Sequence, residues 1–288
     1  MKKITALILT VALVCCFAAS LASCGSDKII VDTNAYFAPF EYYNSKGEIV
    51  GVDVEIMKLV GEKLGKEVEF KNTDFSVIID NVSSGKLYDA GAAGITITAA
   101  RQEKVDFSNP YYTSVQYVIM KVDSDLETRE ANGVEYIVWE ALAGKRLGTQ
   151  LDTTGWIYTD GEINATEDND YGYAGTLYGT NTTHTAYDSA QLAADAVKAG
   201  QCDVVIIDEL PAQFITEKNS GFKCVPLYYA GETEAEDEPV IEQYAICVTK
   251  GNEELLAAIN EVLAELLVED ANGITKIEKM VMAHMGME

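Results

Sequence analysis

The sequence predicts an α/β protein built from two lobes. Short apolar strands alternate with amphipathic helices from Lys28 onward, and the same alternation starts again at Arg146. Such alternation is typical of domains with a largely parallel sheet covered by helices. An acidic stretch at Glu232–Glu238 precedes the last strand and helices. The chain has 288 residues, enough for about two domains, and is therefore expected to form two lobes and to cross between them.

The first unit opens with an apolar strand at Lys28–Thr33, followed by a helix at Asp53–Leu64 in which apolar residues recur at helical spacing. The rest of this unit is expected to contain a strand at Val68–Thr73, a helix at Ser76–Gly85, a short buried strand at Ala90–Ala93, a helix that begins at Thr98 and a strand at Gln116–Val122.

The second unit opens with a strand at Arg146–Gln150 and contains a continuous apolar strand at Asp203–Asp208, typical of a buried parallel strand. Its other expected elements are strands at Thr185–Tyr187, Cys224–Tyr228 and Tyr244–Thr249, and helices at Ala190–Ala199, Glu254–Leu267 and Ile274–Met285.

The first 23 residues are predicted to be a signal peptide rather than part of the fold. Two lysines precede an apolar run too short to span a bilayer, and Leu21-Ala22-Ser23-Cys24 follows it. This ending resembles the bacterial lipobox, which predicts lipid attachment at Cys24 and a tether over residues 24–27. The alternative is a plain secretory signal with an incidental cysteine. The mature protein is expected outside the cytoplasm, lipid-anchored to the outer face of the cell membrane, or to the periplasmic face if there are two membranes.

Charge and motif content exclude several function classes. Acidic residues outnumber basic ones 46 to 21, for a net charge of −25, which disfavours nucleic-acid binding. Two histidines cannot build a multi-histidine metal site, and no dinucleotide, phosphate-loop, hydrolase or metalloprotease motif is present. We therefore expect no metal, no cofactor and no catalytic residue. Three cysteines remain in the mature chain, Cys202, Cys224 and Cys247, and we favour buried thiols over the single disulfide that they could form.

One set of residues indicates a site for a small zwitterion. Thr96 and Arg101 lie at an expected helix start, where a hydroxyl and a guanidinium can hold a carboxylate. Asp208 ends an apolar strand, where its carboxylate can hold an ammonium group. A surface arginine that caps a helix, and an Asp208 that serves as a helix N-cap, are the alternatives.

Several segments together resemble the periplasmic amino-acid-binding proteins, the substrate-binding subunits of ABC importers. They are Phe37-Ala38-Pro39-Phe40-Glu41-Tyr42, Gly51-Val52-Asp53-Val54-Glu55, Gly94 through Arg101, Val105 through Tyr111, Gly148 through Gly155, and Asp203 through Pro211. The resemblance implies the type II periplasmic-binding-protein fold, in which two Rossmann-like lobes are joined by two hinge strands and close over the ligand. It places lobe 1 at residues 28–114 and 240–288, and lobe 2 at residues 115–239.

The resemblance also implies roles for individual residues. Arg101 would bind the ligand α-carboxylate with help from Thr96 and Thr154. Asp208 would pair with the α-ammonium group beside the Gly94 carbonyl. The other expected contacts are Phe37 stacking on the side chain, Val52 as a pocket wall, and Asn34 and Gln150 at the side-chain end.

Departures from the family pattern bear on the ligand. Val52 stands where many relatives have an aromatic residue, and Asn34 stands where binders of cationic amino acids often have an acid. We therefore expect a neutral or polar ligand, and glutamine, cystine and small neutral amino acids all stay open. Asp152 replaces a usual glycine, which leaves the geometry of its loop open. The segment Trp156–His184 is longer than usual and is expected to be a surface insertion rather than a partner site.

The expected function is capture of a free amino acid by a monomeric protein, with ABC transporter permease subunits and the membrane, through the lipid anchor, as partners. A sensor lipoprotein that presents its ligand to a membrane receptor is an alternative. A dehydratase-like enzyme on the same fold is a weaker one, for which Glu209 and His184 are the candidate acids.

Overall fold

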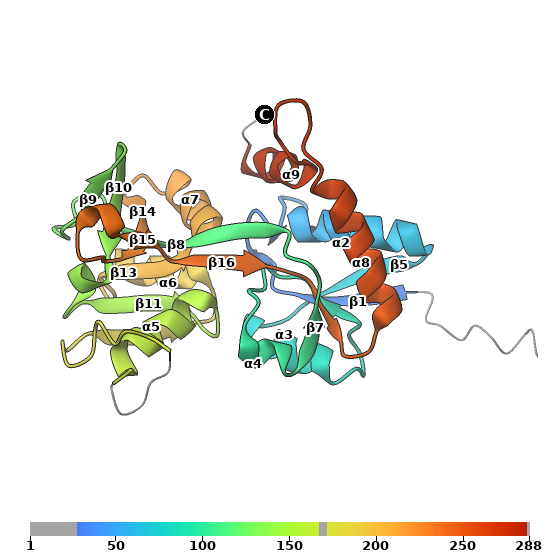
Figure 1. Cartoon of the computed structure of the whole chain (residues 1–288), viewed down its shortest axis with the longest axis horizontal. Helices are drawn as coiled ribbons and strands as arrows, with labels where there is room; N and C mark the ends of the chain where they lie inside the picture. Colours follow the sequence, from blue (N-terminus) through green and yellow to red (C-terminus); the bar gives the residue numbers. More distant parts are fainter. Residues whose placement is uncertain (1–27, 167–171, 287–288) are drawn as a thin grey trace, which may run out of the picture.

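The computed structural model describes residues 28–166 and 172–286, which form two lobes that lie side by side (Figure 1). The predicted signal peptide, Cys24 and the tether lie outside the described residues, as does part of the Trp156–His184 segment. None of the helices in the described ranges combines the length and apolar character needed to cross a membrane.

The first lobe is built on a five-stranded sheet. Its strand order is β5-β1-β6-β17-β7, with β1 parallel to both β5 and β6, and β17 antiparallel to both β6 and β7. The bounds are β1 Lys28–Thr33, β5 Glu67–Asn72, β6 Ala90–Gly91, β7 Val105–Phe107 and β17 Cys247–Thr249. A C-terminal strand thus lies between two strands from the first half of the chain.

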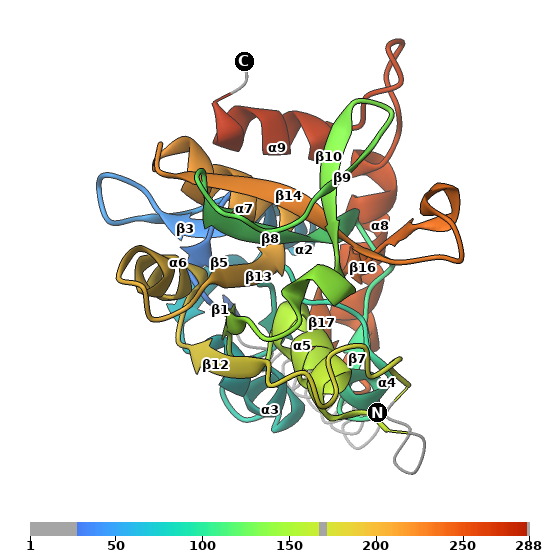
Figure 2. The ribbon, with the colours of Figure 1, turned by 90° about the vertical axis from the view of Figure 1, so that its left-hand side faces the viewer.

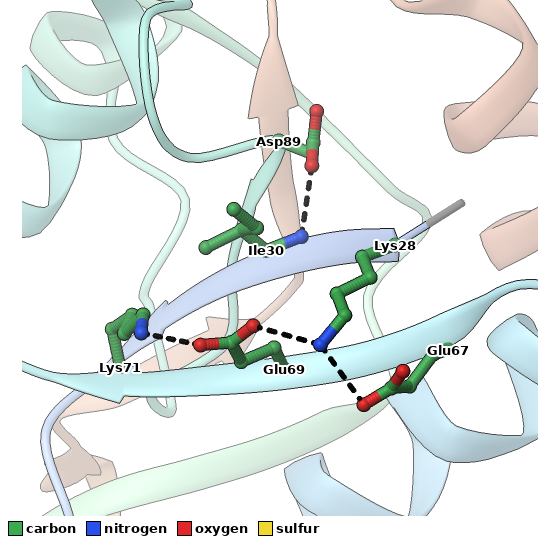
Figure 3. Close-up of polar contacts among 6 residues, drawn as sticks. All are labelled: Lys28, Ile30, Glu67, Glu69, Lys71 and Asp89. Atoms are coloured by element: carbon green, nitrogen blue, oxygen red, sulfur yellow. Dashed lines mark hydrogen bonds and ion pairs between the residues drawn. The ribbon is translucent and has the colours of Figure 1, made fainter. Parts of the chain in front are cut away.

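Five helices and a small sheet complete this lobe. The helices are α2 Val52–Leu64, α3 Phe75–Ser83, α4 Ala99–Gln102, α8 Glu253–Leu266 and α9 Lys276–Met285, and the small sheet is β2 Tyr36–Phe37, β3 Glu41–Tyr43 and β4 Ile49–Val50. Helices α2 and α8 pack against each other. At the sheet edge, Lys28 of β1 bridges Glu67 and Glu69 of β5 (Figure 3). These ion pairs are largely exposed and add little stability.

The second lobe contains a mixed sheet with the order β12-β11-β13-β8-β14-β10-β9 (Figure 2). Strand β11 is parallel to β12 and β13, and β8 is antiparallel to β13 and β14. The strands are β8 Tyr112–Lys121, β9 Arg129–Ala131, β10 Val134–Val138, β11 Arg146–Gln150, β12 Thr183–Tyr187, β13 Val204–Asp208, β14 Phe222–Tyr229 and β15 Glu238–Pro239. The helices are η1 Trp139–Leu142, α5 Thr154–Asn164, α6 Ala190–Lys198, α7 Glu209–Glu217 and η2 Glu234–Glu236.

Two antiparallel strands join the lobes. Strand β8 leaves the first lobe and continues into the sheet of the second, and β16 (Ile241–Tyr244) returns beside it (Figure 1). Their register pairs Ile241 with Val115 and Tyr244 with Tyr112. The interior between the elements is apolar, with Trp139 and Ile206 fully buried in the second lobe.

The sequence placed most elements within one to three residues, and the exceptions have physical causes. Tyr244–Thr249 is not one strand, because the chain leaves the hinge ribbon after Tyr244 and joins another sheet at Cys247. Helix α7 begins at Glu209, directly after Asp208. The β2–β4 sheet and the β9–β10 ribbon were not predicted, because their strands are two to five residues long.

Candidate functional site

The candidate site residues come together where the lobes meet. Arg101 lies in the single-turn helix α4, whose N-cap Thr98 accepts from the Arg101 backbone N–H. The guanidinium is buried and donates to the Thr96 carbonyl at 2.8 Å in its own lobe and to the Asp152 carbonyl at 2.7 Å in the other. Its carbon lies 5.4 Å from the ring centroid of Phe75. Arg101 therefore faces the cleft and is not a surface residue.

Asp152 shows how the loop without its usual glycine is built. Its φ is +60°, a left-handed conformation that aspartate tolerates better than most residues. This conformation belongs to the turn between β11 and α5, in which Asp152 turns its carbonyl toward Arg101. Burial raises the pKa of the Asp152 carboxyl. The next residue, Thr153, caps α5 by accepting from the Trp156 backbone N–H.

Hydroxyl groups join the lobes beside Arg101. Thr154, at the first position of α5, donates to the Thr96 hydroxyl oxygen at 2.6 Å, and Thr96 in turn donates to the carboxylate of Glu242. All three side chains are buried. Thr96 and Thr154 thus contact each other, and Thr96 points at an acid of the hinge strand β16 that was not among the predicted site residues.

Asp208 lies at the end of β13 and is almost fully buried. Its carboxylate accepts from the Tyr244 hydroxyl and from the amide nitrogen of Gln116. Asp208 is the N-cap residue of α7, but its side chain makes no cap hydrogen bond and points into the site instead. Burial raises the pKa of Asp208, and the two hydrogen bonds oppose that rise.

Gly94 has a left-handed backbone conformation, with φ +54°, and lies next to Asp53 and Phe37. Its backbone N–H donates to Asp53 at 2.9 Å, and a Cβ at this position would lie 2.9 Å from the ring of Phe37. Asp53 also accepts from the Tyr111 hydroxyl. Because Asp53 is buried, its pKa rises to about 6 despite these bonds. Gly94 thus lets Phe37 lie against the backbone beside the cleft.

Glu41 is a further acid that the sequence analysis did not select as a site residue. It pairs with Phe37 across the β2–β3 hairpin, and directly opposed residues place their side chains on the same face. The residue is fully buried, and neither carboxylate oxygen has a hydrogen-bond partner in the part of the chain that the structure describes. Burial and the nearby charges of Asp53 and Asp208 raise the pKa of Glu41 well above its usual range.

Two amides meet at the predicted side-chain end. Gln150, the last residue of β11, donates to the Asn34 amide oxygen at 3.0 Å, and Asn34 donates to the Thr73 carbonyl at 2.7 Å. The amide oxygen of Gln150 is buried and has no hydrogen-bond partner among the described residues. Together with the Arg101–Asp152 and Thr154–Thr96 contacts, this bond makes the structure a closed arrangement of the lobes.

Val52 lies in the core of the first lobe and not among the polar site residues described above. It is the first residue of α2 and is fully buried in the core of the first lobe, in the cluster that contains Phe37 and Phe40. Contact between Val52 and a ligand stays a prediction.

The candidate acids of the enzyme alternative are bound within the second lobe. Glu209 accepts from Tyr117 at 3.1 Å and from Gln213, while His184 bonds to Thr149 at 2.7 Å. Burial lowers the pKa of His184. Across residues 28–166 and 172–286, no group of three or more histidine, cysteine or acidic side chains could hold a metal ion. Cys202, Cys224 and Cys247 are free thiols.

The sequence matches a known family over most of its length. Residues 29–276 match the model of bacterial extracellular solute-binding proteins, family 3. The chain belongs to this family. Its members bind solutes, so the protein is a binding protein and not an enzyme, as predicted. The family also makes it an extracellular or periplasmic protein.

Curated relatives include proteins for different amino acids. The chain is 34% identical over 145 residues to the arginine-binding extracellular protein ArtP of Bacillus subtilis, covering 47% of this chain and 52% of the relative. It is 28% identical over 156 residues to the histidine-binding periplasmic protein of Escherichia coli K12, covering 54% and 55%. The L-cystine-binding protein TcyJ of the same strain is 23% identical over 240 residues, covering 83% and 77%. The alignment spans about half the length of the first two relatives.

Solved structures show the same fold. An ancestral arginine-binding protein bound to arginine matches with a TM-score of 0.70 at 29% identity, covering 90% of this chain and 98% of that chain. The amino acid ABC transporter substrate-binding protein AbpA from Streptococcus pneumoniae, bound to L-arginine, matches with a TM-score of 0.70 at 28% identity, covering 90% and 95%. The predicted two-lobed type II periplasmic-binding-protein fold is confirmed.

Proposed function

We propose that the protein captures a free α-amino acid between its lobes and delivers it to an ABC importer. The observation that carries the proposal is that the buried side chains of Arg101 and Asp208, one from each lobe, lie near enough to interact electrostatically without contacting each other. A guanidinium can bind a carboxylate with two parallel bonds, and an aspartate can hold an ammonium group. A zwitterion that contacts both lobes stabilises the closed form selectively, as ligand-driven closure requires.

The relatives support this assignment in chemical terms. Each curated relative described above is named as the binding protein of an amino acid, and both solved structures described hold arginine. Membrane permease subunits would be the partners of such a protein. A sensor that presents the same ligand to a receptor would use the same cleft, and capture of permease subunits by the tagged lipoprotein separates the two.

For the ligand side chain, we favour a cationic group over the neutral one expected from Asn34. Glu41 carries a buried carboxylate with no hydrogen-bond partner among the described residues, next to Phe37 on the cleft-facing side. A buried charge without a partner is costly, and a guanidinium or ammonium group would satisfy it. The second candidate is a neutral amide side chain such as that of glutamine, because the Asn34–Gln150 pair offers a free amide oxygen to an N–H donor.

A thermal-shift panel followed by calorimetry tests whether the protein binds a free amino acid and which class of side chain it prefers. The chain from residue 25 onward would be unfolded, refolded without ligand and screened against the common amino acids and cystine at about 1 mM. A dissociation constant near 1 μM would add roughly 4 kcal/mol to the free energy of unfolding. This corresponds to a rise of roughly 8–16 °C in Tm. A panel with no shift would refute amino-acid capture.

Glu41→Gln decides between the two ligand classes. If the ligand is cationic, this variant should lose affinity for arginine by about 10-fold or more, because a charged hydrogen bond becomes a neutral one. Its affinity for glutamine should change little. Gln243→Glu, at an exposed position on the hinge strand, changes charge outside the site and is the control. Unchanged arginine affinity in Glu41→Gln, with strong glutamine binding, would favour the neutral ligand.

The anchor, the lobe boundaries and the oligomeric state complete the proposal. We propose that Cys24 is lipidated after cleavage, that lobe 2 spans residues 115–239 between two parts of lobe 1, and that the protein is a monomer. Mass spectrometry of the N-terminal peptide from membranes tests the first, because an unmodified Cys24 would exclude the anchor. Limited proteolysis tests the second, and light scattering of residues 25–288 tests the third.

A further inference from the structure

Glu242 lies buried among the candidate site residues, bonded to Thr96 and Gln116, although the family resemblance assigned it no role. It comes from β16, where Glu242 and Tyr244 are buried and the intervening Gln243 is exposed. The same strand pairs with β8, which supplies Gln116 to the site. A hinge strand therefore brings a carboxylate next to the groups expected to hold the ligand.

Glu242 and Asp208 form a pair of carboxylates held by one amide. The amide nitrogen of Gln116 donates to an oxygen of each. The second oxygen of Asp208 accepts from Tyr244, and the second oxygen of Glu242 accepts from Thr96. All of these donors are neutral, so the pair is well hydrogen-bonded without a compensating positive charge in contact.

The nearby cation Arg101 donates no hydrogen bond to Asp208 or Glu242 among the described residues. Arg101 bonds to the carbonyls of Thr96 and Asp152 and acts on the pair only at longer range. The charged and titratable groups that face Glu242 are Arg101 of α4, Asp208 at the end of β13, Tyr158 of α5 and Tyr244 on its own strand. Glu41 of β3 faces Asp208, the other member of the pair. Burial and the charge of Asp208 raise the pKa of Glu242 well above its usual range. Two carboxylates this close in a buried site cannot both be ionised cheaply, so one proton is retained.

A second observation points to a ligand with N–H donors at this place. The amide oxygen of Gln116 is fully buried and has no hydrogen-bond partner in the described ranges. It belongs to the same amide that holds the two carboxylates. Buried acceptors of this kind are normally satisfied, so the site is built to accept hydrogen bonds from a bound group.

We propose that Glu242 is the second carboxylate of the ammonium subsite, and that the Asp208–Glu242 pair releases its shared proton when the α-ammonium group of the ligand binds. This inference rests on the proposed function. On binding, ammonium N–H groups donate to the two carboxylates, the O–H bond of the shared carboxylic acid breaks, and the proton passes to the buffer. The positive charge of the ligand thus replaces that of the proton.

Calorimetry in two buffers measures this exchange directly. Titrations of L-arginine and of L-glutamine into the refolded protein near pH 7, in phosphate and in Tris, give heats that differ by the ionisation enthalpy of the buffer times the protons released. We expect the Asp208–Glu242 pair to release close to one proton per bound ligand. L-Arginine should release up to one proton more, because its cationic side chain would also ionise the buried Glu41. By linkage, the dissociation constant should then fall by up to about tenfold for each unit rise in pH while the pair holds its proton.

Glu242→Gln should bind the same amino acid with about one proton fewer released than the wild type and a correspondingly weaker dependence of affinity on pH, because Asp208 alone stays ionised beside Gln116 and Tyr244. Asp208→Asn leaves Glu242 without its acidic partner and should also lose the release, with weaker binding. Glu238→Gln removes the same charge at an exposed position of β15 and should behave as the wild type.

The outcomes separate this inference from the function on which it rests. Binding by the wild type without proton release, or equal release by Glu242→Gln and the wild type, would overturn the proton exchange and leave amino-acid capture intact. Failure of the refolded wild type to bind any amino acid of the thermal-shift panel would overturn both.

Discussion

Replacing Arg101 with alanine is expected to remove most of the affinity for an amino acid. In the closed structure the guanidinium donates to the Thr96 and Asp152 carbonyls, and we propose that it also binds the ligand carboxylate. The variant leaves that carboxylate buried without its cation, which typically costs about 2–5 kcal/mol. This free energy corresponds to a loss of about 30-fold to several thousand-fold in affinity.

Closure of the lobes adds a second contribution. The Arg101–Asp152 bond crosses between lobes and exists only when they are closed. In the variant, the Asp152 carbonyl loses its donor on closing, at a cost of about 1–3 kcal/mol if no water replaces it. The closed state is therefore weakened even without ligand, and the affinity loss should lie toward the upper end of the range.

Isothermal titration calorimetry with the amino acid found in the panel measures the loss. Arg101→Lys keeps the positive charge but cannot bind a carboxylate bidentately, so its affinity for the ligand should lie between those of the wild type and Arg101→Ala. Arg146→Ala removes an exposed arginine that pairs with Asp203 and should bind as the wild type does. Equal affinity for Arg101→Ala and Arg146→Ala would refute the assignment of Arg101 to the ligand carboxylate.

Three further changes probe the structure around the site. Gly94→Ala should lower the free energy of unfolding by about 1–2 kcal/mol because alanine disfavours the left-handed backbone of this position. It should also weaken ligand binding, because the added Cβ would lie 2.9 Å from the Phe37 ring. Chemical denaturation and calorimetry check the two effects, and wild-type behaviour in both would contradict the tight contact. The folded-state pKa of Asp53, about 6, is above its ordinary value of 3.8, so the folded state binds more protons and the free energy of unfolding should rise as pH falls from about 7 to 4, by up to about 3 kcal/mol from this group. Asp53→Asn should show a correspondingly smaller rise in urea titrations at several pH values, and an identical pH dependence would refute the shift. Ile206→Ala, at the centre of β13, should cost about 2–5 kcal/mol and lower Tm by roughly 4–20 °C in a scanning experiment, and a Tm loss below this range would mean that the strand is packed loosely.

The sequence predicted the parts of the site that lie on strongly patterned segments. Thr96, Arg101, Thr154 and Asp208 each follow a strand or begin a helix, and the structure brings them to one place. Position alone could not show that Thr98, and not Arg101, caps the helix.

Glu242 was missed for an identifiable reason. It lies between the acidic stretch Glu232–Glu238 and the strand expected from Tyr244, in a segment for which no element was predicted, whereas β16 begins at Ile241. Alternation along Ile241-Glu242-Gln243-Tyr244 was the available signal, because it places Glu242 on the same face as the buried Tyr244. Glu41 lies in a three-residue strand, whose cross-strand partner no local pattern specifies.

The position of β17 has a consequence for how the protein is made. Because β17 lies between β6 and β7, the first lobe cannot complete its sheet until Cys247–Thr249 has been synthesised and exported. The second lobe takes nearly all of its strands from one continuous stretch before that point. It can therefore fold while the sheet of the first lobe still lacks β17. During export, β6 therefore keeps an unpaired edge that could pair with another chain. Premature termination anywhere before β17 would leave a folded second lobe attached to an open sheet.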